Sequence, residues 1–177
     1  GYDAVVFALD GTLVRLAVDW DAVATETAAV LAGGGLAADD LSLWEMLDAA
    51  DEVGLREEVE TVVAAHERDG AIRSERLPGA DDLATLGRPA AVCSLNSEAA
   101  VRAALDRHDL ADATGAVVGR DTVPTRKPDP EPVLAALRPL GVSPDRALFV
   151  GDSERDAAAA ERAGVDFRYV GDGPSGH

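Results

Sequence analysis

Short apolar runs alternate with helical patterns along most of the chain. Five runs are typical of buried strands, because each is only a few residues long and almost wholly apolar. They span residues 4–9, 89–93, 115–119, 146–150 and 167–170. Strands that alternate with helices favour a parallel sheet whose two faces are both covered. The pattern therefore predicts an α/β fold with a Rossmann-like parallel sheet of about five strands.

Three helices are predicted between the later strands, from Ser97 to about His108, from Pro132 to Leu137 and from Asp156 to Ala163. Ser97 has the hydroxyl that favours the first position of a helix, and Pro132 suits a first turn. Gly164 follows the third pattern and is typical of a helix end. The tail, residues 171–177, is expected to fray.

A long stretch, residues 15–77, interrupts this alternation. It contains no convincing strand. Three helical patterns follow one another there instead, over residues 20–31, 41–50 and 55–66. We therefore expect an inserted helical unit over residues 15–77, with Trp20 and Trp44 in its hydrophobic core. The α/β core would consist of residues 1–14 and 78–177.

Composition and charge exclude several classes of protein. The chain has 177 residues, 47% of them hydrophobic, which suits a globular core with one insertion. No apolar run approaches the ~18 residues of a membrane span. A net charge of −17 argues against nucleic acid as a partner, because the phosphate backbone would be repelled. A single cysteine, Cys93, excludes an internal disulfide. We expect a soluble, cytoplasmic protein, either a monomer or a homodimer.

The basic residues are unevenly divided. Lys127 is the only lysine among 16 basic residues, which face 33 acidic ones. A surface rich in acids and poor in lysine suits a protein that works in concentrated salt, where self-repulsion is screened. A halophilic source is therefore one hypothesis. A GC-rich genome that favours arginine, alanine, glycine and aspartate codons is the alternative.

Polar residues gather where the predicted strands end. They are Asp10, Gly11 and Thr12 after the first strand, Ser94 after the second, and Asp152 and Asp156 after the fourth. Ligands bind beyond the carboxyl ends of parallel strands. Carboxylates suit Mg²⁺, while a hydroxyl, turn amides and Lys127 suit an anion. Each feature alone also fits an ordinary turn, helix cap or helix N-terminus. Together they predict a site for a phosphorylated ligand.

These segments, in this order, resemble the haloacid dehalogenase superfamily of phosphohydrolases, and its phosphoglycolate phosphatase-like members in particular. The four segments that carry the resemblance are residues 7–13, Ser94, Lys127 in its proline-rich loop, and residues 149–156. The helical stretch lies where that family has an α-helical cap. The resemblance implies a hydrolase that uses Mg²⁺ to act on a small phosphorylated metabolite.

The resemblance also implies roles for individual residues. Asp10 would be the general acid and base, and would bind the metal together with Asp152 and Asp156. Ser94, Leu95 and Lys127 would lie at the phosphoryl group, with Lys127 assisting catalysis. Gly11 and Thr12 would form the turn that cradles the phosphate.

Two positions depart from the family pattern. Ala8 stands where the family has the aspartate that attacks phosphorus, and Leu95 stands where many members have asparagine. Alanine can neither attack phosphorus nor bind a metal, so the rate should fall by orders of magnitude. Three explanations remain open: an engineered knock-out, a natural loss in a protein that binds a phosphorylated ligand or partner, or weak residual hydrolysis.

Other chemistries find less support in the sequence. A cysteine phosphatase needs an arginine about six residues after its cysteine, but the next arginine after Cys93 is Arg102. Glycine-rich nucleotide-binding loops are absent. Some basic side chains of the helical stretch are candidates for substrate selection, although a solvated helix surface is the favoured explanation: Arg56, His66, Arg68, Arg73 and Arg76.

Overall fold

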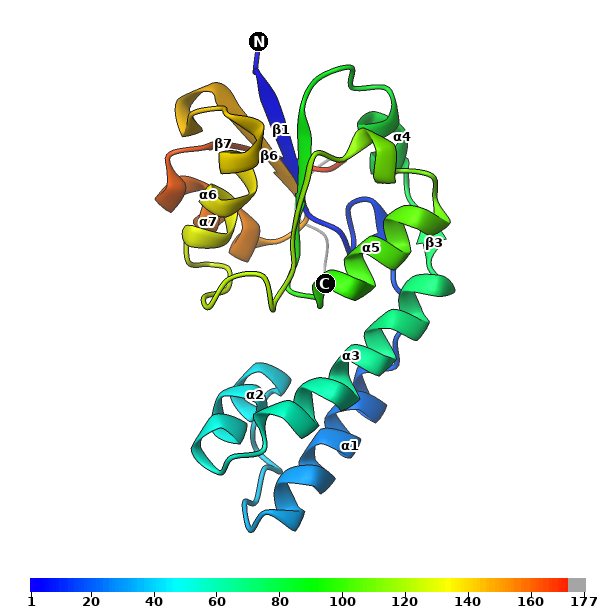
Figure 1. Cartoon of the computed structure of the whole chain (residues 1–177), viewed down its shortest axis with the longest axis vertical. Coiled ribbons are helices and arrows are strands. Elements are labelled where there is room, and N and C mark those ends of the chain that lie inside the picture. Colours follow the sequence, from blue (N-terminus) through cyan, green and yellow to red (C-terminus); the bar gives the residue numbers. More distant parts are fainter. Residues whose placement is uncertain (172–177) are drawn as a thin grey trace.

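A parallel five-stranded sheet forms the centre of the computed structural model, which describes residues 1–171 (Figure 1). The strand order is β5-β4-β1-β6-β7, and every neighbouring pair is parallel. The strands are β1 (Ala4–Phe7), β4 (Ala90–Cys93), β5 (Ala116–Val118), β6 (Ala147–Gly151) and β7 (Asp166–Tyr169). All five strands predicted from apolar runs are confirmed. Apart from Gly171, the tail that we expected to fray lies outside the described residues.

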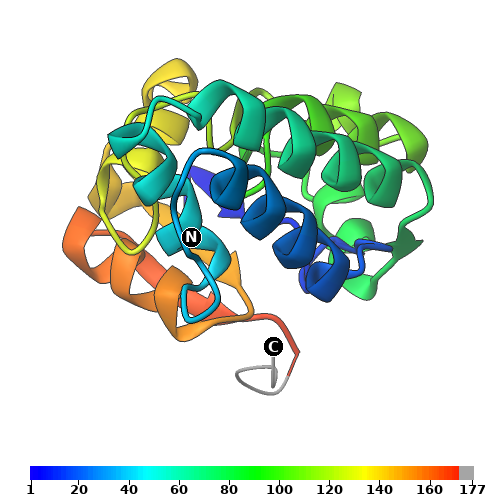
Figure 2. The ribbon, with the colours of Figure 1, turned by 90° about the horizontal axis from the view of Figure 1, so that it is seen from below.

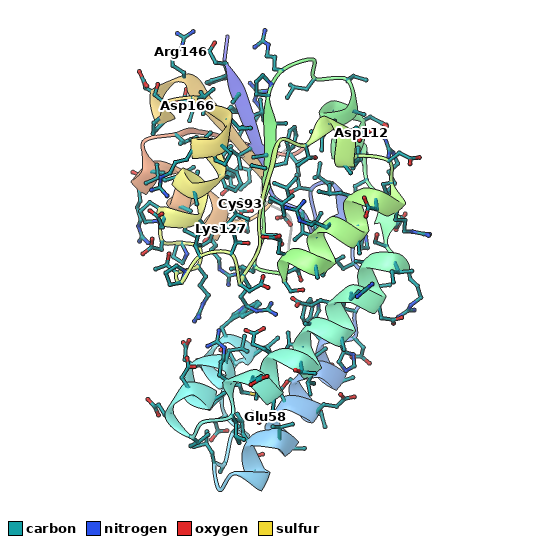
Figure 3. The ribbon with its side chains drawn as sticks, viewed as in Figure 1. Glu58, Cys93, Asp112, Lys127, Arg146 and Asp166 are labelled. Carbon is teal, nitrogen blue, oxygen red and sulfur yellow. The ribbon has the colours of Figure 1, made fainter. Side chains whose placement is uncertain are left out.

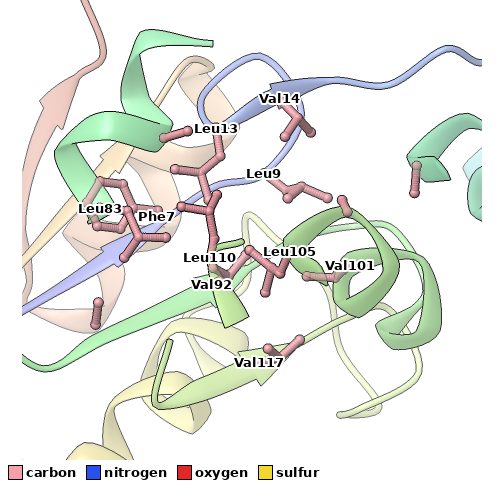
Figure 4. Packing of buried hydrophobic residues seen from close by; sticks show 14 of the residues in the cluster. Phe7, Leu9, Leu13, Val14, Leu83, Val92, Val101, Leu105, Leu110 and Val117 are labelled. Atoms are coloured by element: carbon pink, nitrogen blue, oxygen red, sulfur yellow. The ribbon is translucent and has the colours of Figure 1, made fainter. Parts of the chain in front are cut away.

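Helices cover both faces of the sheet because its strands are apolar on both sides. In β1, Val5 and Phe7 point into one buried cluster, whereas Ala4 and Val6 point into another. The first cluster includes side chains of α4 and α5 (Figure 4), and the second includes those of α6 and α7. This alternation is the period-2 pattern of a strand with two buried faces. The helices are α4 (Pro78–Ala84), α5 (Glu98–Arg107), α6 (Glu131–Leu137) and α7 (Glu154–Ala163).

The helix ends explain where the connecting loops begin. Ser97 caps α5 by accepting a hydrogen bond from the Ala100 amide at 3.3 Å, and Ser153 caps α7 in the same way. Gly164 ends α7 with a positive φ of 76°, a conformation that glycine adopts readily. The three predicted core helices are confirmed, although α4 was not predicted. Single-turn 3-10 segments occupy Ala111–Ala113, Arg138–Leu140 and Pro144–Arg146.

Three further helices form the inserted helical unit, which lies beyond the carboxyl ends of the strands (Figure 1). They are α1 (Trp20–Gly33), α2 (Leu43–Glu52) and α3 (Arg56–Ile72). Figure 2 shows α1 and α3 side by side, and the three helices share a buried cluster that includes Val23, Leu47 and Val63. Ser42 and Glu45 form a capping box that fixes the start of α2.

The expectation of no strand in this stretch is wrong at its two ends. β2 (Val14–Arg15) pairs antiparallel with β3 (Glu75–Arg76), so the two connections to the helical unit run side by side. Strands of two residues are too short to show a hydrophobic period, so the pattern of apolar residues does not predict them. No helix among residues 1–171 is long and apolar enough to cross a membrane.

Candidate active site

A cavity of about 530 Å³ opens between the carboxyl ends of the strands and the helical unit. Most of the site residues expected from the sequence line it, namely Ala8, Asp10, Gly11, Ser94, Leu95, Lys127, Asp152 and Asp156. They follow β1, β4 and β6 or lie in the loop before α6, so the folded sheet collects them from four separate segments. This placement is the one expected for a ligand site of a parallel sheet.

Thr12 is the one expected site residue that does not line the cavity. Its side chain is fully buried, and within residues 1–171 its hydroxyl has no hydrogen-bond partner. The turn after Asp10 directs it inward, where its carbonyl lies against Gly79: a Cβ atom there would be 2.2 Å from the Thr12 oxygen. Thr12 is therefore a buried part of the turn and not part of the cavity wall.

The turn after β1 requires a glycine, because the Asp152 carboxylate lies against it. Gly11 has a φ of +81°, and a Cβ atom on it would lie only 1.9 Å from Oδ2 of Asp152. Asp10 is oriented by the Leu16 amide, which donates to its Oδ1 at 3.0 Å. The Asp152 carboxylate thus lies against the backbone that carries Asp10, on the floor of the cavity.

Asn96 lines the cavity as well, although the sequence analysis did not select it. Its backbone amide and its Nδ2 donate to the Ser94 hydroxyl oxygen at 3.1 Å and 2.9 Å. Because this oxygen accepts two hydrogen bonds, the Ser94 proton is directed to a third position. Asn96 follows the expected second motif by two residues, and this proximity to Ser94 was the available signal.

Lys127 is fixed at the back of the cavity. Its Nζ donates to the Cys93 carbonyl oxygen at 3.1 Å and to Oδ1 of Asp156 at 2.5 Å, and Figure 3 shows Lys127 beside Cys93. Burial alone would lower the pKa of the ammonium, but the facing Asp156 carboxylate outweighs it and raises that pKa. Lys127 is therefore a permanent positive charge at this position.

Two of the carboxylates that line the cavity are suited to binding Mg²⁺. Ala8 contributes no side-chain oxygen, and Asp156 is occupied by Lys127 and by the Asp152 amide, which donates to its Oδ2 at 3.3 Å. Within residues 1–171 no group of three histidine, cysteine or acidic side chains is arranged to hold a metal. Asp10 and Asp152 both line the cavity and are the carboxylates that would hold the ion. Mg²⁺ commonly takes one or two carboxylates and completes its shell with water and phosphate oxygens, so the residues present fit it when a phosphoryl group also binds.

The aromatic part of the cavity lining differs from expectation. Trp20 and Trp44 line the cavity, whereas the sequence placed both in the core of the helical unit. That placement is wrong for Trp20, which is 36% exposed, while Trp44 both faces the cavity and packs against the core of the unit. None of the five basic candidates of the helical stretch lines the cavity; Arg15 and Arg155 do.

A buried ion pair between Arg120 and Glu67 supports the loop that carries Ser94. Arg120 Nη1 and Nη2 donate to the two carboxylate oxygens of Glu67 at 2.8 Å and 2.9 Å, and Nη1 also donates to the Leu95 carbonyl at 2.8 Å. Glu60 accepts further hydrogen bonds from the same guanidinium. The Arg120 amide donates to the Asn96 carbonyl at 2.7 Å. Helix α3 is thereby joined to the loop between Ser94 and Asn96.

Electrostatics of this pair follow from burial. The side chains of Arg120 and Glu67 are 3% and 0% exposed. Burial raises the pKa of Glu67 against the opposing effect of the Arg120 hydrogen bonds. Burial would lower the pKa of Arg120, but the two glutamates outweigh it and raise that pKa. The guanidinium is charged at every physiological pH.

Comparisons with known proteins find similar sequences among hydrolases. Residues 78–170 match the sequence model of the family described as haloacid dehalogenase-like hydrolase. Phosphoglycolate phosphatase of Rhodospirillum rubrum is 38% identical over 92% of this chain and 76% of its own length. N-acetylmuramic acid 6-phosphate phosphatase of Pseudomonas aeruginosa is 30% identical, over 94% of this chain and 80% of its own length.

Solved structures show the same fold. The crystal structure of a HAD-superfamily hydrolase, subfamily IA, variant 1, from Geobacter sulfurreducens superposes with a TM-score of 0.64. The two sequences are 28% identical, and the match covers 94% of this chain and 88% of that one. The similarity therefore extends through both the α/β core and the helical unit.

Proposed function

The chain belongs to the haloacid dehalogenase-like hydrolase family, and on that basis we propose that its cavity binds a small phosphate monoester together with Mg²⁺. The observation that carries this proposal is the convergence of Asp10, Ser94, Lys127 and Asp152 on one cavity from distant parts of the chain. Relatives of this chain are phosphatases, so the reaction class is the hydrolysis of a phosphate ester.

The phosphoryl group would bind at the polar floor of the cavity, which is formed by Asp10, Ser94, Lys127 and Asp152. Lys127 supplies a fixed ammonium there, and the Ser94 proton is available because Asn96 occupies the other side of that oxygen. Asp156 holds Lys127 in place, which makes it a positioning residue in this proposal and not a metal ligand. Leu95 takes part through its backbone, because its carbonyl oxygen accepts a hydrogen bond from Arg120 and this bond holds the loop that carries Ser94.

Asp10 and Asp152 are the residues that would hold Mg²⁺. When bound, the metal would neutralise part of the negative charge of the phosphoryl oxygens. Because only two carboxylates would hold the metal, the affinity of the site for it should depend on the presence of phosphate. By the family resemblance, Asp10 would also protonate the leaving oxygen or take a proton from water.

Ala8 limits what this site can do. It lines the cavity at the position of the family nucleophile, and its methyl group offers no electron pair. Hydrolysis by the chain as it stands would need a direct attack by water, with Asp10 as the base. We expect that route to be slower by orders of magnitude than the covalent route of the family. The alternative is a protein that binds a phosphorylated ligand or partner without turnover.

The test restores the missing group. Ala8→Asp should produce Mg²⁺-dependent release of phosphate from a panel of monoesters that includes phosphoglycolate and N-acetylmuramic acid 6-phosphate. Ala8→Asn is the matched control, because it has nearly the same shape without a nucleophilic carboxylate. Activity in Ala8→Asp alone supports a phosphatase scaffold. Binding of phosphate by Ala8→Asp without turnover supports the binding protein, and a failure of both variants to bind phosphate contradicts the proposal.

We also propose that residues 15–77 act as a cap over the cavity. The contacts that support this role come from α2 and α3: Asp48 forms a bidentate pair with Arg126, next to Lys127, at 2.9 Å and 3.0 Å. Glu60 and Glu67 reach Arg120 from α3. A cytoplasmic location and the choice between monomer and homodimer stay predictions from the sequence.

A further inference from the structure

Two indole rings form part of the wall of the cavity, alongside the basic side chains of Arg15 and Arg155. The chain has two tryptophans, and both line this one cavity. Trp20 is the first residue of α1 and Trp44 is the second residue of α2, so two separate helices each contribute an indole ring. Aromatic residues are only 4% of the chain, and 36% exposure of Trp20 leaves a large apolar surface in water.

Trp44 is held in position before any ligand binds. The guanidinium carbon of Arg120 lies 5.9 Å from the centre of its ring, which is within the range of a cation–π contact. Arg120 itself is fixed by Glu67 and by the Leu95 carbonyl. A ring that is already ordered loses little conformational freedom when a ligand stacks on it, and this strengthens binding.

The size of the cavity points in the same direction. At about 530 Å³ it falls in the range of sites that enclose complete small-molecule ligands. The polar floor accounts for the phosphoryl group alone. The rest of the cavity, which the two indole rings help to line, must therefore accommodate the leaving group. Indole rings bind best to other flat surfaces that are partly apolar.

From this arrangement we propose that the preferred ligand is a phosphate monoester whose leaving group contains a ring that stacks on Trp20 and Trp44. The ring is a sugar or a nucleobase, since both present a flat face. This inference rests on the proposed function, because it assumes that the phosphoryl group occupies the polar floor. It narrows the substrate class and disfavours the two-carbon leaving group of phosphoglycolate.

The absence of a nucleophile at position 8 allows the inference to be tested by equilibrium binding on the unmodified chain. Titration calorimetry in the presence of Mg²⁺ would compare inorganic phosphate, phosphoglycolate, glycerol 3-phosphate, glucose 6-phosphate and adenosine 5′-monophosphate. At least one of the two ring-bearing esters should bind about 10-fold more tightly than either open-chain ester. Its binding should also change the fluorescence of the indole rings, whereas inorganic phosphate should change it little.

Variants identify the rings responsible. Trp20→Ala and Trp44→Ala should each weaken the ring-bearing ester about 10-fold and leave the affinity for inorganic phosphate unchanged. Ile72→Ala is the matched control, because Ile72 is a large apolar side chain that is 50% exposed and does not line the cavity. If an alanine variant fails to fold, the corresponding phenylalanine variant should retain most of the ring preference.

The possible outcomes distinguish a failure of this inference from a failure of the proposed function. Equal affinities for open-chain and ring-bearing esters, unaffected by the tryptophan variants, would overturn the ring preference and leave phosphate binding intact. No binding of inorganic phosphate or of any ester would overturn both. A preference for the sugar ester or for the nucleotide supports the inference in either case, and decides which ring the cavity takes.

Discussion

Arg120 and Glu67 face each other end-on in the interior, 53 residues apart in the chain, with two parallel hydrogen bonds of 2.8 Å and 2.9 Å. Arg120 belongs to the α/β core and Glu67 to α3 of the helical unit. The same guanidinium contacts the Leu95 carbonyl and the ring of Trp44. One side chain therefore connects the loop that carries Ser94, the helical unit and Trp44.

Removal of the guanidinium should destabilise the protein strongly. Arg120→Met leaves the Glu67 carboxylate buried without its partner, and we expect a loss of about 3–5 kcal/mol in the free energy of unfolding. Adding Glu67→Gln to this variant should recover part of the loss. Urea unfolding measures both changes. Arg138→Met removes an exposed pair with Glu131 and should have a far smaller effect. Equal effects of the two methionine variants would contradict the prediction.

The same variant should respond to pH in a defined direction. The native pKa of Glu67 is already raised by burial, and without Arg120 it should rise further. A carboxyl group whose native pKa exceeds its unfolded value of about 4.3 stabilises the native state only while it is protonated, and this contribution disappears as pH rises. The deficit of Arg120→Met relative to the parent should therefore shrink in acid and grow towards neutral pH. A deficit that is constant with pH would argue against an ionised Glu67.

Asn96 should matter for anion binding more than for stability. In Asn96→Ala the Ser94 hydroxyl loses the Nδ2 donor and is free to rotate, so we expect the affinity for inorganic phosphate to fall about 5- to 10-fold. Calorimetry with Mg²⁺ present would measure it. Ser143→Ala, which breaks an exposed hydrogen bond to Asp145, is the control and should leave the affinity unchanged. Unaltered phosphate binding by Asn96→Ala would remove Asn96 from the site.

Two buried hydroxyls offer a route to a more stable protein. The hydroxyls of Thr12 and Thr27 have no hydrogen-bond partner within the described part of the chain. Valine has the same shape without the polar atom, so Thr12→Val and Thr27→Val should each raise the free energy of unfolding by about 1 kcal/mol. Thr85→Val removes a hydroxyl that donates to the Asp81 carbonyl and should bring no gain. A loss of stability in the first two variants would reveal a partner for these groups.

Salt should stabilise the chain if its acidic surface is an adaptation. With a net charge of −17, self-repulsion opposes folding in dilute buffer, and molar salt reduces the screening length to about 3 Å. We expect the midpoint of thermal unfolding to rise between 0.1 and 2 M KCl, and not to rise to the same extent in sucrose of equal osmolarity. A midpoint that does not respond to KCl would favour codon usage as the origin of the composition.

The sequence predicts the parts of this fold that depend on local pattern. Strands β1, β4 and β6 are buried on both faces, so they appear as continuous apolar runs, and the polar residues after them mark the site directly. Asp10 could be selected because a fold of this class collects strand ends at one edge. Lys127 stood out as the only lysine, in a proline-rich loop, and Ala8 through the resemblance to the family.

What the sequence does not predict depends on contacts between distant segments. Glu67 and Arg120 are charged residues of the kind that usually lie on the surface, and nothing near either one indicates that they pair inside. Trp20 was placed in a core because indole is apolar, but its position at the start of α1 turns it towards the cavity. β2 and β3 form only because the two ends of the helical unit come together.

That pairing of β2 with β3 bears on how such a protein can acquire or exchange its helical unit. Val14 lies opposite Arg76 and Arg15 opposite Glu75, so the excursion begins and ends at neighbouring points of the backbone. A module grafted between such adjacent ends leaves the topology of the sheet unchanged, whatever its length. The buried contact between the two parts restricts which helical units can be exchanged. A replacement unit without a counterpart of Glu67 would leave the Arg120 guanidinium of the α/β core buried with too little compensating charge.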